Sequence, residues 1–131
     1  MPPEPVFFLD RAMSARRVVE ALQTSGAAFH RHDDSFPQNT PDTDWLPHVG
    51  RQGWFVITQD LRIRYNPLEK RALMENQVGA FILVGKNLTG AGMAECITRA
   101  LPRMTELARQ QPRPFIAKVY ADGRVLLLKV I

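Results

Sequence analysis

The stretch TPDTDWLPHVGRQGWFVITQD, residues 40–60, decides the predicted fold because it indicates one helix followed by one buried strand. Thr40 is a good helix N-cap and Pro41 fits the first helical position. The two aspartates that follow lie where the helix dipole favours negative charge. Pro47 is expected to kink or shorten this helix. Residues 54–58 are apolar or β-branched, which predicts a strand buried on both faces.

The same alternation of strand and helix extends along the chain on both sides of this unit. Buried strands are predicted at 6–9 and 81–84, a weaker strand at 27–29, and helices at 14–25, from 66 and from 89. Ser14 and Asn66 are the predicted caps of two of these helices, and the polar segment 31–39 is predicted to be a loop. Residues 114–131 predict a β-hairpin that turns at Asp122–Gly123. This order indicates an α/β domain with a mainly parallel sheet and right-handed crossovers.

Length and composition are those of a globular protein with one core. The chain has 131 residues, of which 45% are hydrophobic and 23% are charged, so we expect a single domain with a loose N-terminus at 1–5. No apolar run is long enough to cross a bilayer, and no secretory signal is recognisable. The single cysteine excludes an internal disulfide and indicates a cytoplasmic protein. The net charge of +4 favours anionic partners such as nucleic acid.

Acidic residues follow the predicted strands at the edge where open parallel sheets bind ligands. Asp10 follows the first strand, Asp33 and Asp34 the second, and Asp60 the third, while Asp42 and Asp44 open the helix that leads into the third strand. Carboxylates crowded at one edge repel one another unless a hard cation lies between them, and Mg²⁺ or Mn²⁺ prefers such oxygen ligands. Each aspartate alone has a structural explanation, as a strand end, a helix cap or a loop residue, so only their joint placement favours a metal site.

Other kinds of site have weaker support in the sequence. The three histidines show no zinc-ligand spacing with Cys96, and that cysteine lies among apolar helix positions typical of a core. The segment GKNLTGAG lacks the order of a phosphate-binding P-loop. The carboxylates therefore remain the main candidates for chemistry.

Three segments together resemble the PIN-domain proteins, in particular the short PIN-like group related to the VapC ribonuclease toxins of toxin–antitoxin pairs. They are FFLD at 7–10, the opening stretch at 40–60, and AFILVGKNLTG at 80–90. The best motif is an aspartate that opens a helix, then a glycine, an apolar strand and Thr-x-Asp; here these are Asp42, Gly53, 54–57, and Thr58 with Asp60. The resemblance spans about residues 6–110.

The resemblance implies a three-layer α/β/α sandwich, a carboxylate cluster that binds Mg²⁺ or Mn²⁺, and an endoribonuclease that cleaves RNA phosphodiesters. Asp10, Asp42 and Asp60 are the catalytic and metal-binding residues that carry over by position. PIN domains place a further acidic residue on a helix between the first two of these, where this chain has only HDDS. Asp34 or Asp44 is the candidate substitute.

Around these carboxylates the sequence offers supporting groups. Thr58 is expected to hold Asp60 through its hydroxyl group, or simply to favour the strand. Arg11, Arg62, Arg64 and Lys86 are candidates for contacts with the RNA backbone, or else solvated surface charges. A toxin also needs a cognate antitoxin protein, which the C-terminal hairpin could bind, although the same exposed edge could form a homodimer. The alternative to the nuclease is a non-catalytic PIN-like module that binds RNA or protein.

Overall fold

The computed structural model describes residues 4–13, 15–37, 39–59, 65–85 and 89–128. Within these ranges the strands are β1 (Val6–Leu9), β2 (Ala28–Arg31), β3 (Phe55–Thr58), β4 (Gly79–Leu83), β5 (Phe115–Val119) and β6 (Val125–Leu128). The helical elements are the 3₁₀ turn η1 (Arg11–Met13) and the helices α1 (Arg16–Thr24), α2 (His32–Ser35), α3 (Asp42–Gln52), α5 (Pro67–Glu75) and α6 (Gly90–Gln110). This order confirms the predicted α/β class.

The strands form one sheet in the order β2-β1-β3-β4-β5-β6. All neighbours are parallel except β5 and β6, which pair antiparallel as the predicted C-terminal hairpin. The hairpin turns where the sequence indicates, because Gly123 adopts a φ of 94° and the backbone amide of Arg124 donates to Asp122 Oδ1 at 3.1 Å. The mainly parallel sheet is therefore confirmed.

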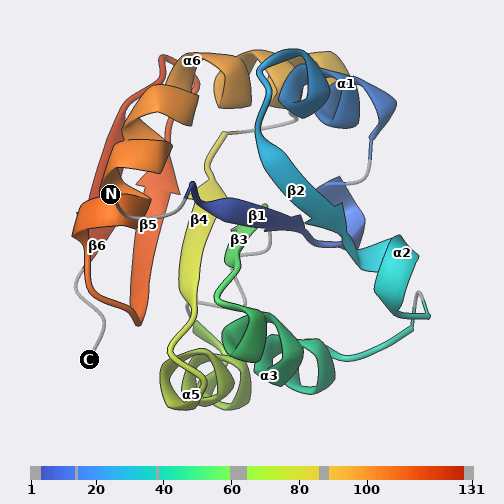
Figure 1. The fold of residues 1–131 in the computed structure, drawn as a ribbon, viewed down its shortest axis with the longest axis vertical. Coiled ribbons are helices and arrows are strands. Elements are labelled where there is room, and N and C mark those ends of the chain that lie inside the picture. Colours follow the sequence, from blue (N-terminus) through green and yellow to red (C-terminus); the bar gives the residue numbers. More distant parts are fainter. Residues whose placement is uncertain (1–3, 14, 38, 60–64, 86–88, 129–131) are drawn as a thin grey trace.

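Two helical layers cover the two faces of the sheet, as Figure 1 shows with α1 and α6 on one side and α3 and α5 on the other. Successive strand residues point to opposite faces. Phe7 and Leu9 pack in the core beneath α1 and α6, whereas Phe8 packs with Trp45 and Leu73 of the other layer. A sheet buried on both faces explains why its strands are almost continuously apolar. The three-layer sandwich is confirmed.

Helix boundaries correct the sequence prediction at two places. The N-cap of α3 is Pro41 and not Thr40, and no side chain caps the helix. The prediction was wrong by one residue because the Pro41 carbonyl, at 2.9 Å from the amide of Asp44, already accepts the first helical hydrogen bond. Pro47 does not shorten α3, which continues to Gln52. Ser14 lies outside the described residues, and Ala15 is the N-cap of α1 in its place.

The Asn66 cap is confirmed. Its side-chain oxygen accepts from the amides of Leu68 and Glu69 at the start of α5.

The predicted loop at 31–39 contains a helical turn, α2. His32 in this turn is only 1% exposed and packs among the rings of Phe8, Phe36 and Trp45. The loop prediction was wrong here because aromatic side chains from distant segments bury a residue that looks polar in its local sequence.

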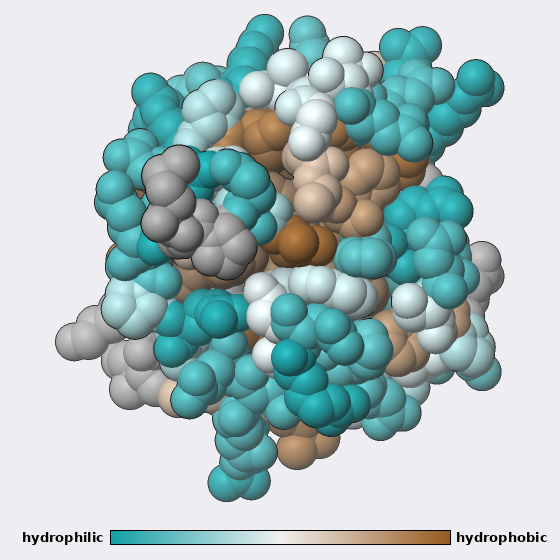
Figure 2. All heavy atoms as spheres, viewed as in Figure 1, coloured by the Kyte–Doolittle hydropathy of each residue, from teal (hydrophilic) through white to brown (hydrophobic). Residues whose placement is uncertain are grey.

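The surface in the orientation of Figure 1 is mainly polar. Figure 2 shows hydrophilic side chains over most of this face and a smaller apolar area near its centre, between the two helical layers. In the part of the chain that the structure describes, no helix has the length and apolar character required to cross a membrane. Residues 4 and 5 are anchored, since Pro5 is buried and Glu4 forms an ion pair with Arg109.

Gly50 gives a test of how closely α3 approaches the turn after α5. A Cβ built at Gly50 would lie 2.3 Å from the carbonyl oxygen of Asn76. We expect Gly50→Ala to lower the free energy of unfolding by about 1–3 kcal/mol, because overpacking forces the backbone to shift. Gly90→Ala is the matched control, since its Cβ would meet Ala15 at an ordinary 3.4 Å. Urea unfolding followed by circular dichroism measures both, and equal midpoints would contradict the close contact.

Cys96 gives a second test, of the core beneath α6. Its side chain is 1% exposed and its sulfur contacts the carbonyl oxygen of Tyr120 at 3.4 Å. Burial raises the pKa of the Cys96 thiol, so less of the reactive thiolate is present at any given pH. We expect the folded protein to react slowly with a disulfide reagent at pH 8 and the urea-unfolded protein to react at once. Rapid reaction of one equivalent in the folded state would show that this part of the core is open.

Candidate active site

Asp10 lies at the point where the topology of the sheet changes direction. The chain leaves β1 to form β2 on one side, and later forms β3 on the other side of β1. In open α/β sheets, ligands bind beyond the carboxyl ends of strands at such a switch point. Asp10 is the first residue after β1, and its amide donates to the Ile57 carbonyl of β3 at 3.3 Å. The sheet itself therefore fixes the position of this residue.

The Asp10 carboxylate is buried and hydrogen-bonded on both oxygens. Only 8% of the residue is exposed. Oδ1 accepts from the backbone amide of Met13 at 3.1 Å, and Oδ2 accepts from the hydroxyl of Thr58, the last residue of β3. Both carboxylate oxygens thus take part in hydrogen bonds inside the protein. The arrangement fits a carboxylate that is held in one orientation.

Thr58 has a described partner that the sequence did not indicate. The Thr58 hydroxyl donates to Asp10. Asp60, which the sequence suggested as its partner, lies outside the described residues, so that contact stays a prediction. Thr58 is 1% exposed, so its hydroxyl needs a partner inside the protein. The bond joins β1 to β3 at their carboxyl ends. Local sequence could not show this contact, because the two residues are 48 positions apart.

Asp42 is the first residue of α3, and topology places it toward the same edge. The C-terminal end of α3 leads through Gly53 into the start of β3, so the N-terminal end of α3 lies toward the carboxyl ends of the strands. Asp42 Oδ1 accepts from the indole nitrogen of Trp45 at 3.1 Å. Trp45 in turn packs against Phe8 of β1, with ring centroids 5.1 Å apart. The core thus anchors Asp42 relative to the strand that carries Asp10.

Sequence reasoning missed the contact between Asp42 and Trp45. The spacing of three residues on a helix is the signal that could have found it, because such residues share a face.

The two candidate substitutes for the missing family carboxylate are both exposed. Asp44 lies two positions after Asp42 on α3, and such residues do not share a helical face. Asp34 in α2 accepts from Arg31 at 3.0 and 3.3 Å. The hydrogen bond from Arg31 is the main cause that lowers the pKa of Asp34. This carboxylate is therefore already paired with a cation on its own segment.

Of the remaining residues predicted for the site, Arg11 is described by the structure and the others are not. Arg11 is exposed and directly follows Asp10. Asp60, Arg62, Arg64 and Lys86 lie outside the described residues. Among the residues that the structure places, no three histidine, cysteine or acidic side chains are grouped to hold a metal ion. Within the predicted triad, the described residues are therefore Asp10 and Asp42.

The donor chemistry of these carboxylates suits a hard divalent cation. Mg²⁺ and Mn²⁺ prefer oxygen ligands, and Mg²⁺ commonly binds through one or two carboxylates while keeping several waters. Hydrogen bonds from Met13 and Thr58 hold the Asp10 carboxylate in one orientation, as is typical of carboxylates that ligate metals. The oxygen donors of Asp10 and Asp42 are therefore of the type that such an ion binds, and Asp60 stays the predicted third ligand.

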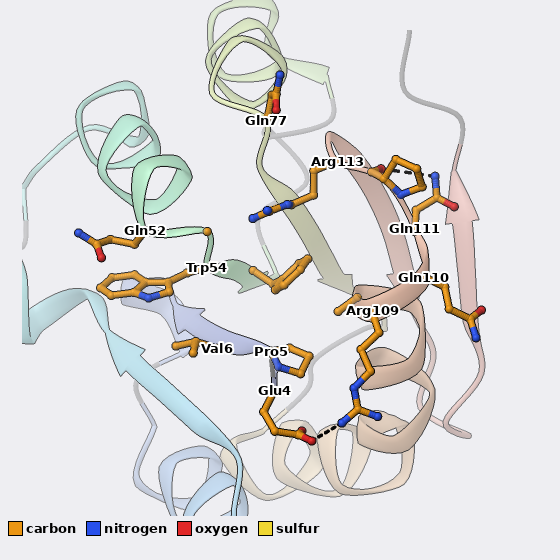
Figure 3. Close-up of a pocket in the computed structure, with 14 residues that line it drawn as sticks. Glu4, Pro5, Val6, Gln52, Trp54, Gln77, Arg109, Gln110, Gln111 and Arg113 are labelled. Carbon is orange, nitrogen blue, oxygen red and sulfur yellow. Dashed lines mark hydrogen bonds and ion pairs between the residues drawn. The ribbon is translucent and has the colours of Figure 1, made fainter. Parts of the chain in front are cut away.

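A separate pocket of about 610 Å³ lies at the opposite edge, where the strands begin (Figure 3). Its lining includes the ion pair of Glu4 with Arg109. The guanidinium of Arg113 lies over the Phe55 ring, 5.3 Å from its centroid. This pocket contains none of the predicted catalytic residues, so it is distinct from the carboxyl edge.

Comparison with known proteins agrees with the geometry. A family model described as a PIN like domain matches residues 5–85, which include β1 to β4 with Asp10, Asp42 and Thr58. The chain is also 24% identical over 125 residues to a Mycobacterium tuberculosis protein named "Putative ribonuclease VapC45", across 92% of this chain and 90% of that protein. No solved structure matches. Because the family model covers more than half of the sequence, the chain belongs to the PIN-like domain family.

Proposed function

We propose that this protein is a metal-dependent endoribonuclease that hydrolyses RNA phosphodiesters. The observation that carries the proposal is the buried carboxylate of Asp10, held by Thr58 and Met13 at the switch point of a parallel sheet. A buried carboxylate is costly, and its retention at a ligand-binding edge favours a functional role. The name of the Mycobacterium tuberculosis relative, which denotes a ribonuclease, supports the same reaction.

Each residue has a defined part in this proposal. Asp10, Asp42 and Asp60 would hold Mg²⁺ or Mn²⁺, and Thr58 would keep Asp10 oriented. A bound divalent ion supplies a water of lowered pKa and offsets the charge that develops on the phosphate. The cationic side chains expected at this edge would bind the RNA backbone and counter the repulsion between carboxylates and phosphate. These are Arg11, Arg62, Arg64 and Lys86.

We further propose that the protein is the cytoplasmic toxin of a toxin–antitoxin pair. The relative carries a VapC name, and an RNA-cleaving toxin needs a protein that restrains it. The C-terminal hairpin is the proposed antitoxin surface, because Leu126 and Leu127 of the edge strand β6 are 51% and 39% exposed. An edge strand with exposed leucines can pair with a strand of another chain. A second copy of this protein is the rival occupant, and co-expression with the neighbouring gene separates the two.

The alternative function is a PIN-like module that binds RNA or protein without catalysis. It is motivated by the position where PIN domains carry a further acid, since Asp34 is paired with Arg31 and Asp44 is exposed. Such a module would bind its partner equally well with and without a divalent metal. Metal-activated cleavage distinguishes the two functions, and competition with single-stranded DNA tests whether RNA is the preferred substrate.

Asp10→Asn is the central test. We expect Mg²⁺ or Mn²⁺ to switch on cleavage of a fluorescent single-stranded RNA, and EDTA to abolish it. The variant should lose more than about 100-fold in rate, beyond the 10- to 100-fold loss that is typical when a residue only orients a metal ligand. Asp122→Asn is the matched control, since it removes one carboxylate from the exposed hairpin turn. Undiminished cleavage in EDTA, or by Asp10→Asn, would refute the nuclease proposal.

Thr58→Val tests the positioning role of the hydroxyl group. Valine keeps the shape and strand preference of threonine but removes the donor to Asp10 Oδ2. We expect a loss of about 10- to 100-fold in metal affinity or activity, and a loss of about 1–3 kcal/mol in the free energy of unfolding. Thr58→Ser should recover the activity because it restores the hydroxyl. Equal activity of the Val and Ser variants would show that the bond does not position Asp10.

A further inference from the structure

Three nearly parallel rings form a column that runs from the core to the surface. The rings of Phe8 and Trp54 are 6.0 Å apart at an angle of 12° between their planes. The rings of Trp54 and His30 are 4.1 Å apart at 19°. Phe8 is completely buried, Trp54 is half-buried and His30 is exposed. The column therefore ends in an imidazole ring at the protein surface.

The protein holds the middle ring of this column in place. The imidazole of His48 on α3 packs edge-on against Trp54, with centroids 5.4 Å apart and planes at 72°. The Trp54 amide donates to the carbonyl of Val49 at 3.1 Å. Figure 3 shows the Trp54 ring and the Gln52 side chain extending to the same side, away from Arg113. The platform beneath His30 is thus formed by the fold before any ligand binds.

The terminal ring belongs to a residue that is exposed to solvent. His30 belongs to β2, which is an edge strand of the sheet. Its imidazole stacks on Trp54, and among the described residues no other aromatic ring packs against it. A flat aromatic ligand could therefore extend the column by one ring.

We propose that the exposed face of His30 is a stacking site for one base of single-stranded RNA. Unstacked bases bind proteins by lying on aromatic rings, and histidine is among the residues used. Such stacking tolerates any sequence, because every base has a flat π-face. This inference rests on the proposed function and extends it, since it names a contact to a base and not to the backbone.

The register of the strands gives the position of His30 relative to Asp10. His30 is in register with Phe8 of β1, and Asp10 lies two residues beyond Phe8, directly after the end of β1. Two strand residues correspond to about 7 Å. A base on His30 would thus lie level with Phe8, between the carboxyl edge that carries Asp10 and the opposite edge, where Trp54 lines the pocket. The nearby charges of Arg31 and Asp34 are paired with each other, which weakens the attraction of the Arg31 charge for RNA phosphates.

Substitutions at His30 in an Asp10→Asn background test the proposal without RNA cleavage. His30→Ala and His30→Gln remove the ring, whereas His30→Phe keeps one. Fluorescence anisotropy with a labelled single-stranded RNA gives the dissociation constants. We expect Ala and Gln to weaken binding by about 5- to 150-fold, which corresponds to one stacked base, and Phe to retain binding within about threefold. Gln23→Ala, an exposed change on α1 in the opposite layer, should have no effect.

The outcomes separate stacking from other roles of His30. Equal loss in the Gln and Phe variants, no loss in the Ala variant, or no RNA binding by the Asp10→Asn protein would each overturn the stacking site. Retention by Gln together with loss by Phe would also overturn it, because it would assign the contact to hydrogen bonding. Cleavage by the chain with Asp10 intact is measured separately and tests the nuclease proposal alone.

Discussion

The hydrogen bond from the Thr58 hydroxyl to the Asp10 carboxylate is the interaction on which the proposed site depends. A carboxylate that leaves water needs donors, or its burial is strongly unfavourable. Asp10 receives them from the backbone of η1 and from the end of β3, so its burial requires that β1 and β3 lie side by side. The same contact that satisfies a buried charge also aligns the two strands at their carboxyl ends. Fold and site are therefore fixed together.

The aromatic core extends this coupling to the second described carboxylate. Phe8 faces the layer of α3 and α5, where it contacts Trp45, whose indole nitrogen holds Asp42. The same phenylalanine is the buried end of the column that reaches His30. One core residue thus supports both a candidate metal ligand and the proposed base platform. In this family member, packing inside the protein and the proposed recognition of RNA would use the same side chains.

The sequence predicts the parts of this structure whose signals are local. Apolar strands that alternate with helices indicate the three-layer sandwich, and Asn66 and Asp122–Gly123 are correctly identified because a cap or a turn involves neighbouring residues. His32 was misread because the rings that bury it come from other segments.

The predicted site shows the same limit. The sequence indicates that Asp10 follows a strand. It does not indicate the hydrogen bond to Thr58, because the two residues are 48 positions apart and no periodic pattern connects them. The N-cap of α3 was predicted one residue too early, at Thr40, because the carbonyl of Thr40 or of the neighbouring Pro41 can accept the first hydrogen bond of the helix.

The position of β1 has a consequence for how the protein is made. Of the strands that form this sheet, β1 is synthesised first, and it becomes an interior strand with β2 and β3 as its neighbours. Its hydrogen bonds to β3 must wait until the chain has grown past residue 58, and pairing over such a separation is slow because loop closure comes first. Val6–Leu9 is thus an apolar segment that nascent-chain chaperones would meet before its partner strand exists.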